Sequence, residues 1–285
     1  MNDARTKTIL LRDGRRLAYA VYGNAAGSAL FYFHGMPGSR QECLFADTLL
    51  QQLGIRLIVA DRPGYGLSEF HENRTLLDWA ADVAQLADAL ELDRFAVLGF
   101  SGGGPHALAC AHELEERLTA VGLISSLAPL DAPGMWDCVS PAFRDVHELA
   151  ASNPALLEQQ LAPAAASPEA VLAMFEAPAP PVDKAMFADP AFRARCLTNL
   201  TESLRQGAKA TAWDLHLVDR PWGFDLARIQ RPVQLWHGSD DINAPVAMGR
   251  YLAQTLPQCT ARIMEGEGHY SILNHMALIM RKLSV

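Results

Sequence analysis

The sequence lacks paired cysteines that would indicate a disulfide framework or a metal site. Its five cysteines are scattered, odd in number and without C-x-x-C spacing. Disulfide-rich secreted proteins and zinc sites both use closely spaced groups of cysteines. We therefore expect reduced thiols that pack as small hydrophobic groups, and neither a metal nor an organic cofactor. These cysteines are Cys43, Cys110, Cys138, Cys196 and Cys259.

Long hydrophobic runs are also missing. No stretch approaches the roughly 18–20 apolar residues that cross a bilayer, and the opening MNDARTKTIL has no apolar centre typical of a secretory signal. The formal net charge of −8 is spread along the chain, which gives no reason to expect nucleic acid as a partner. We expect a cytoplasmic protein that binds a small molecule and neither nucleic acid nor membrane. A homodimer is compatible with the sequence.

What is present fits a large globular domain. The chain has 285 residues, of which 50% are hydrophobic and 20% charged, enough for one sizeable core with a smaller insertion. Two β-prone runs, Thr8–Leu11 and Arg16–Tyr22, flank Asp13-Gly14, a dipeptide typical of hairpin turns. The sheet is therefore expected to begin with an antiparallel pair.

After this hairpin, apolar runs alternate with amphipathic stretches. Several runs, such as Leu57–Ala60, are apolar on both faces, which is typical of a parallel sheet covered by helices on both sides. The pattern predicts an α/β fold with right-handed crossovers, whose ligands bind at the carboxyl ends of the strands. The predicted strands are Ala29–Phe33, Arg56–Ala60, Phe95–Phe100, Ala120–Ser125, Val233–Trp236 and Ala261–Met264. The predicted helices are Gln41–Gln52, Leu76–Glu91, Pro105–Glu115, Pro245–Thr255 and Tyr270–Arg281.

The stretch from 127 to 218 interrupts this alternation. It holds no convincing strand, and prolines divide it into short helical pieces. Its aromatic residues give it too much apolar bulk for a disordered linker. We therefore predict an inserted helical cap over 127–218 and a core formed by 1–126 and 219–285.

The strongest chemical signal is Gly99-Phe100-Ser101-Gly102-Gly103, between a predicted strand and a predicted helix. This is G-x-S-x-G in its required context, where a serine on a strained turn needs small neighbours. The N–H of Gly102 would stabilise negative charge at the same point. A glycine turn that only packs the helix is the structural alternative. A phosphate-binding loop is disfavoured, because the glycine run lacks the lysine of that motif.

Two further loops follow predicted strands. In His34-Gly35-Met36-Pro37-Gly38-Ser39 the N–H of Met36 is a candidate second oxyanion donor, and His34 is expected to hydrogen-bond the loop backbone. In the segment 61–68, DRPGYGLS, the proline and glycines indicate a rigid loop that supports the first one. Asp61 and Arg62 are expected to pair locally.

The remaining candidates are an acid and a base. Trp236-His237-Gly238-Ser239-Asp240-Asp241 places carboxylates at a strand end, and we prefer Asp241 as the orienting acid over Asp240 or the more distant Asp131. Gly266-Glu267-Gly268-His269-Tyr270 follows the last predicted strand, where the glycines let the imidazole reach a serine. The order Ser101, Asp241, His269 is that of one known triad arrangement.

Taken together, the segments HGMPGS, DRPGYGLS, GFSGGGP, GSDD and GEGH resemble the α/β-hydrolase superfamily, over most of the chain outside 127–218. The resemblance implies an eight-stranded, mostly parallel sheet with a cap over the site. It also implies roles for five residues: Ser101 is the nucleophile, Asp241 the acid, His269 the base, and Met36 and Gly102 the oxyanion donors. Relatives that use an aspartate nucleophile are disfavoured, because Ser101 occupies that position.

These residues predict a serine hydrolase that acts through an acyl-enzyme on a small or medium, largely apolar ester, lactone or thioester. A carbon–carbon bond hydrolase or a perhydrolase would use the same triad, and a ligand receptor without turnover would use the same fold. The candidates for an apolar substrate pocket in the cap are Met135, Trp136, Phe143, Phe175 and Trp213.

Overall fold

The computed structural model describes residues 5–44 and 46–284. Eight strands form one sheet in the order β1-β2-β4-β3-β5-β6-β7-β8. Its strands are β1 Thr6–Leu10, β2 Arg16–Gly23, β3 Ser28–Phe33, β4 Ile55–Ala60, β5 Phe95–Phe100, β6 Leu118–Ile124, β7 Val233–Gly238 and β8 Cys259–Met264. The predicted mostly parallel sheet of eight strands is confirmed.

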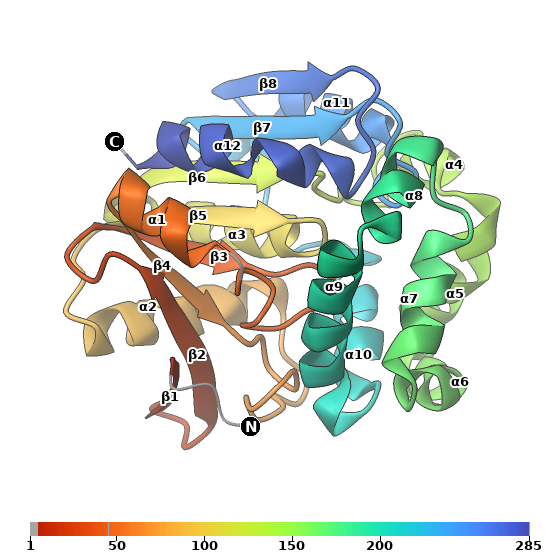
Figure 1. The fold of residues 1–285 in the computed structure, drawn as a ribbon, viewed down its shortest axis with the longest axis horizontal. Coiled ribbons are helices and arrows are strands. Elements are labelled where there is room, and N and C mark those ends of the chain that lie inside the picture. Colours follow the sequence, from red (N-terminus) through yellow and green to blue (C-terminus); the bar gives the residue numbers. More distant parts are fainter. Residues whose placement is uncertain (1–4, 45, 285) are drawn as a thin grey trace.

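The antiparallel part of the sheet is confined to its first strands. β1 pairs with β2 through the predicted hairpin, with Leu10 opposite Arg16, and β2 pairs antiparallel with β4. Every other neighbouring pair is parallel. The carboxyl ends of the parallel strands therefore meet at one edge of the sheet, where their arrowheads point in Figure 1.

Helices cover both faces of the sheet. Alternate strand residues belong to two separate cores: Phe31 and Ile58 pack with helices on one face, and Leu30 and Leu57 pack with helices on the other. The helices of the first face are α2 Leu76–Ala89, α3 Gly103–Glu113 and α11 Val246–Thr255, and those of the second are α1 Asp47–Leu53 and α12 Met276–Leu283. This two-sided burial explains why the central strands are apolar at consecutive positions.

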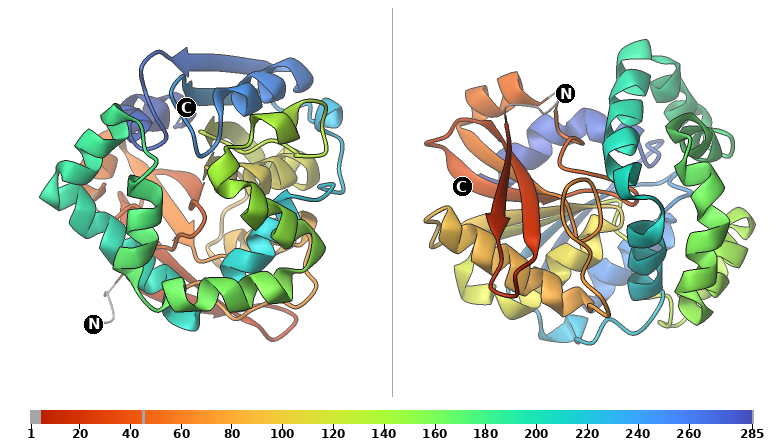
Figure 2. Two further views of the ribbon diagram at one scale, coloured as in Figure 1. Left: turned by 90° about the vertical axis from the view of Figure 1, so that its right-hand side faces the viewer. Right: turned by 90° about the horizontal axis from the view of Figure 1, so that it is seen from below.

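Between β6 and β7 the described chain forms helices and no strand. Five of these helices begin with a proline at the first or second position. Proline lacks an N–H, but an N–H at these positions has no partner within the helix, so no hydrogen bond is lost. The helices are α4 Met135–Cys138, α5 Pro141–Ser152, α6 Pro154–Ala165, α7 Pro168–Glu176, α8 Pro181–Ala188, α9 Pro190–Ser203 and α10 Lys209–Val218. They lie together beyond the carboxyl ends of the parallel strands (Figures 1 and 2).

The other predicted helices differ from the observed ones by one or two residues at one or both ends, and two predicted helices differ more. The helix expected over Gln41–Gln52 begins only at Asp47, because residues 41–44 form turns that hold the Glu42 side chain against Gly35. The helix expected over Tyr270–Arg281 is divided into a short 3₁₀ helix, η4 Ser271–His275, and α12. Short 3₁₀ helices also cover Glu115–Arg117 (η1), Leu204–Gln206 (η2) and Leu226–Arg228 (η3).

None of the helices in residues 5–44 and 46–284 combines the length and the apolar character that a bilayer span requires.

Candidate active site

Ser101 lies on a strained turn between β5 and α3. Its φ angle is +53°, a value that non-glycine residues rarely adopt. A Cβ atom on Gly99 would lie 2.4 Å from the carbonyl oxygen of Gly103, and one on Gly103 would lie 2.1 Å from that of Phe33. Both positions therefore require glycine, as the G-x-S-x-G pattern predicts, and the serine hydroxyl reaches a cavity above the sheet edge.

Asp241 and His269 meet at the carboxyl ends of β7 and β8. The Oδ2 atom of Asp241 lies 2.8 Å from Nδ1 of His269, and both side chains are buried. The other carboxylate oxygen, Oδ1, accepts the N–H groups of Asn243 and Ala244 at 3.0 and 2.8 Å. These bonds fix the carboxylate and assign the imidazole proton to Nδ1, which leaves Nε2 as an acceptor.

The charge balance of this pair favours a basic imidazole. Burial alone would lower the pKa of His269, but the charge and hydrogen bond of Asp241, together with the charges of Asp183 and Glu42, outweigh it, and the net pKa of His269 is raised. Burial would raise the pKa of Asp241, and the charge and hydrogen bond of His269 reverse this, so its net pKa is lowered. By contrast, Asp240 is exposed and accepts a bond from the Ser239 hydroxyl at 2.8 Å, as expected of a turn residue.

The two predicted oxyanion donors are neighbours in space. A Cβ atom on Gly102 would lie 2.8 Å from Cβ of Met36, so the two loops are in contact beside Ser101. In the described part of the chain, neither the Met36 nor the Gly102 N–H makes a hydrogen bond. Two N–H groups without partners beside a serine hydroxyl are suited to a developing negative charge.

A buried ion pair supports the loop that carries Met36. Arg62 donates its backbone N–H to Nε2 of His34 at 3.1 Å, and its guanidinium donates to the carbonyl oxygens of His34 and Gly35. Its Nε donates to Oδ2 of Asp214 in α10 at 2.8 Å. Nδ1 of His34 lies 2.8 Å from the Gly35 carbonyl oxygen, so His34 binds the loop backbone as predicted.

The expected local pairing of Asp61 with Arg62 is wrong. Asp61 instead accepts bonds from the backbone and guanidinium of Arg40, both at 2.6 Å. Arg62 pairs with Asp214, which lies 152 residues further along the chain. The side chains of neighbouring loop residues point in different directions here, and each finds a partner that sequence proximity does not indicate.

A second carboxylate from the helices beyond the sheet holds the loop that carries His269. Asp183 in α8 is buried, and its Oδ2 accepts the N–H of His269 at 2.8 Å. Its Oδ1 accepts the N–H groups of Tyr270 and Ser271 at 3.1 and 2.8 Å. A Cβ atom on Gly268 would lie 2.5 Å from this carboxylate, which explains the glycine at that position. No sequence pattern indicates Asp183, because it is one acidic residue in a short helix.

A cavity of about 230 Å³ lies between the sheet edge and helices α5, α6, α7, α9 and α10, and both Ser101 and His269 line it. Of the five pocket residues predicted from the sequence, Phe143 and Phe175 line it as well. The prediction is wrong for the other three. Met135 and Trp136 pack into the core beneath α11, and Trp213 donates its indole N–H to the Arg74 carbonyl oxygen at 3.2 Å.

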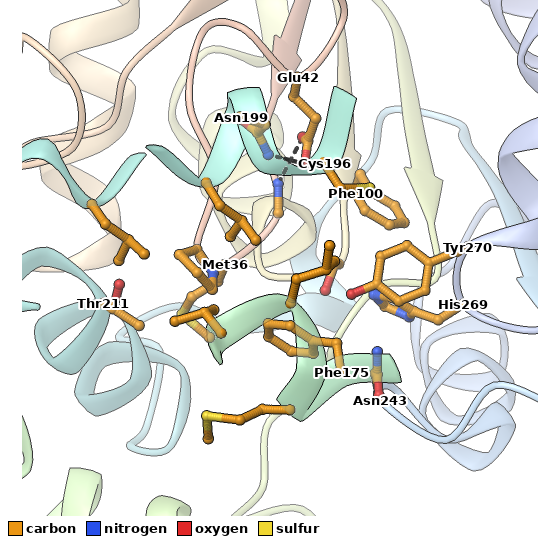
Figure 3. A pocket seen from close by; sticks show the side chains of 18 of the residues that line it. Met36, Glu42, Phe100, Phe175, Cys196, Asn199, Thr211, Asn243, His269 and Tyr270 are labelled. Carbon is orange, nitrogen blue, oxygen red and sulfur yellow. Dashed lines mark hydrogen bonds between the residues drawn. The ribbon is translucent and has the colours of Figure 1, made fainter. Parts of the chain in front are cut away.

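A carboxyl group that the sequence motifs do not include also lines this cavity. Glu42 accepts the N–H of Gly35 at 2.9 Å and lies near Asn199 of α9, as Figure 3 shows. Burial raises the pKa of Glu42 to about 7. Within the described residues no cluster of three or more His, Cys, Asp or Glu side chains has the arrangement of a metal site.

Comparisons with known proteins agree with this fold. A family model described as the alpha/beta hydrolase fold matches residues 28–276. A Bacillus subtilis (strain 168) protein, provisionally named 2-succinyl-6-hydroxy-2,4-cyclohexadiene-1-carboxylate synthase, is 33% identical over 132 residues, which are 45% of this chain and 47% of the relative. The chain thus spans about half the length of this curated relative.

Solved structures match over nearly the whole chain. A hydrolase from Pseudomonas aeruginosa PA01 aligns with a TM-score of 0.74 and 22% identity, covering 99% of this chain and 98% of the other. An enol-lactonase from Burkholderia xenovorans LB400 aligns with a TM-score of 0.70 and 21% identity, covering 97% of each chain. At these identities the likeness establishes the fold. Because the family model matches most of the sequence, the chain belongs to the α/β-hydrolase fold family.

Proposed function

We propose that the protein is a serine hydrolase that cleaves a small or medium, largely apolar ester, lactone or thioester. One observation carries the proposal. His269, which is hydrogen-bonded to the buried Asp241 at 2.8 Å, lines the same cavity as Ser101 on its strained turn. A serine becomes a useful nucleophile only beside a base whose tautomer is fixed. The bond to Asp241 fixes the tautomer of His269, and the shared cavity supports its role as the base for Ser101.

The proposed reaction proceeds through an acyl-enzyme. Ser101 Oγ attacks the carbonyl carbon while Nε2 of His269 takes its proton, and Asp241 stabilises the imidazolium that forms. The carbonyl oxygen becomes an oxyanion that the N–H groups of Met36 and Gly102 stabilise; one such donor contributes roughly 3–4 kcal/mol to the transition state. The imidazolium returns its proton to the leaving alcohol or thiol. Water then cleaves the acyl-enzyme by the same steps.

The helices over 127–218 act in this proposal as a cap. They supply most of the apolar side chains that line the cavity, and an apolar, enclosed volume strengthens the electrostatic interactions around the oxyanion. The cavity volume of about 230 Å³ fits an acyl group of small or medium size. The boundaries 1–126, 127–218 and 219–285 stay a prediction.

The test combines active-site labelling with a substrate screen. A fluorophosphonate should label the wild-type protein at Ser101, and Ser101→Ala should abolish labelling and lower kcat on p-nitrophenyl esters by about 10⁴–10⁶-fold. Ser152→Ala, at an exposed serine in α5, is the matched control and should leave both unchanged. If Ser101→Ala kept most of the esterase activity, or if the wild type were not labelled, the proposal would fail. A receptor without turnover would give no hydrolysis in a screen of acyl-chain lengths, lactones and thioesters.

A further inference from the structure

Glu42 brings a negative charge into a cavity whose other walls are mainly apolar. Of the described residues that line the cavity, it alone carries a carboxyl group. Its side chain keeps part of its surface accessible, and that surface faces this enclosed space. In Figure 3 Glu42 and Asn199 lie together at one end of the cavity, opposite Phe175 and Asn243.

The carboxyl group is held in place from both sides of the cavity. From the sheet side, the Gly35 N–H donates to Oε2 at 2.9 Å and the Tyr32 hydroxyl also donates a hydrogen bond. From α9, Nδ2 of Asn199 approaches Oε1 at 3.5 Å. The Asn199 amide cannot turn away, because its Oδ1 accepts both the N–H and the hydroxyl of Ser39, at 2.9 and 2.8 Å.

These contacts do not saturate the carboxylate. An ionised carboxyl group accepts about four hydrogen bonds, whereas Glu42 has three donors, and the one from Asn199 is longer than the usual range of about 2.7–3.2 Å. Burial without full compensation raises the pKa of Glu42 to about 7. A ligand that donates an N–H or O–H to the open side would supply the missing solvation.

The cationic groups near Glu42 are already engaged elsewhere. Arg62 pairs with Asp214 and donates to carbonyl oxygens of the loop that carries Met36. Arg195 also lines the cavity, and its guanidinium lies over the Phe192 ring at 5.5 Å from the centroid. A molecule bound in the cavity can therefore supply the hydrogen-bond donor that the Glu42 carboxylate lacks.

We propose that Glu42 is a substrate-recognition residue, and that the cavity takes an ester, lactone or thioester bearing a hydrogen-bond donor, above all a primary ammonium group. This donor binds the carboxylate at the Asn199 end of the cavity while the scissile carbonyl group lies at Ser101. The inference rests on the proposed hydrolase function and narrows it to a class of substrate.

The first test compares matched esters that differ only at the group expected to meet Glu42. p-Nitrophenyl 6-aminohexanoate and p-nitrophenyl heptanoate vary the acyl part, and 6-aminohexyl acetate and heptyl acetate vary the alcohol part. In one of the two pairs, wild-type kcat/KM should favour the amine by about ten- to hundredfold, as a charge-assisted hydrogen bond implies. Glu42→Gln keeps the shape and should reduce that ratio to near one, because only the amine loses a charge-assisted partner.

A purely structural role of Glu42 predicts a different outcome. If the carboxyl group served only to hold the Gly35 loop, Glu42→Gln would slow both members of each pair equally, and their ratio would not change. That result, or a wild-type ratio near one in both pairs, would overturn the proposal. Ser39→Ala removes one of the two hydrogen bonds that hold the Asn199 amide and should lower the ratio less than Glu42→Gln does.

The ratio should also depend on pH in a defined direction. The titratable or charged groups around Glu42 are Tyr32, Cys43, Arg62, Arg195, Cys196, His269 and Tyr270. The titration of His269 as the base affects the hydrolysis of both esters alike and cancels in the ratio. The preference for the amine should therefore rise as pH increases through about 7, where Glu42 ionises. A flat or falling ratio would contradict the assignment.

A binding measurement separates this inference from the hydrolase proposal. Calorimetry with Ser101→Ala should detect 1-hexylamine more tightly bound than 1-hexanol, and Ser101→Ala/Glu42→Gln should lose that difference. If no ester is hydrolysed but the amine preference is present, the hydrolase proposal fails and the recognition site stands. If esters are hydrolysed but neither assay shows an amine preference that depends on Glu42, the recognition site fails alone.

Discussion

Replacing Asp183 tests whether the helices beyond the sheet control the position of His269. Its carboxylate accepts three backbone N–H groups from consecutive residues, at 2.8, 3.1 and 2.8 Å. Asp183→Ala leaves these donors without partners beneath α8. At about 1–3 kcal/mol for each buried unsatisfied group, and because such losses are not fully additive, we expect the free energy of unfolding to fall by about 3–6 kcal/mol.

Asp183→Asn is the more informative variant because it changes one contact. An amide oxygen in place of Oδ1 still accepts the Tyr270 and Ser271 N–H groups, but the amide NH₂ then faces the N–H of His269. Two donors cannot bond, so the His269 backbone moves away. A shift on the order of 1 Å at a catalytic group can cost about 10²-fold in rate, and we expect kcat to fall by about 10–100-fold with little change in KM.

The pH profile distinguishes this positioning role from a loss of stability. The charge of Asp183 is one of the influences that raise the pKa of His269. Asp183→Asn should therefore move the acid limb of kcat/KM to lower pH, which a merely structural defect would not do. The matched control is Asp189→Asn, because Asp189 accepts the Ala191 N–H at 2.9 Å at the start of α9, away from His269. A wild-type profile and rate for Asp183→Asn would refute the reasoning.

Two further predictions concern charge. For an uncharged ester, the acid limb of wild-type kcat/KM should lie above pH 6.5, because only neutral His269 accepts a proton and its pKa in the folded protein is raised above the ordinary value of 6.5. An acid limb below pH 6.5 would contradict this. Burial opposes ionisation of Asp214, but Arg62 and Arg74 hold its pKa well below the ordinary value. Its stabilising effect is thus present above the unfolded pKa and is lost as pH falls through the folded one. Asp214→Asn should lower stability by about 3–5 kcal/mol at pH 7, and urea denaturation at decreasing pH should show the difference from wild type shrinking; a constant difference would argue against this pair.

The sequence predicts those parts of the fold and site that depend on short-range patterns. The strand Phe95–Phe100 has the predicted bounds, because strand, turn and helix signals follow one another directly around Ser101. Asp241 and His269 could be identified in the same way, since each sits in a glycine-containing turn at a strand end. Their meeting at 2.8 Å follows from the topology of a parallel sheet, which brings such turns to one edge.

Two of the contacts that the sequence did not reveal join residues far apart in the chain. Asp183 binds the loop of His269 across 86 residues, and Asp214 binds Arg62 across 152. Neither aspartate belongs to a motif, so only the packing of α8 and α10 against the core reveals them. The same limit explains Trp213: apolar bulk indicates burial but not which cavity or core receives the side chain.

The polar contacts divide the helices beyond the sheet into two groups. α8, α9 and α10 each send a side chain to a loop of the site: Asp183 to the His269 loop, Asn199 to Ser39 and Glu42, and Asp214 to Arg62. Among the described residues, α6 and α7 make no hydrogen bond to those loops and contribute apolar lining such as Leu161 and Phe175. Movement of α8 to α10 away from the core would leave buried donors and charges without partners, which costs free energy. Displacement of α6 and α7 exposes mainly apolar surface and breaks one half-exposed ion pair, between Glu176 of α7 and Arg193 of α9 at 2.6 Å. These two helices can therefore move to widen the cavity at the lowest cost, while the Asp241–His269 pair stays intact.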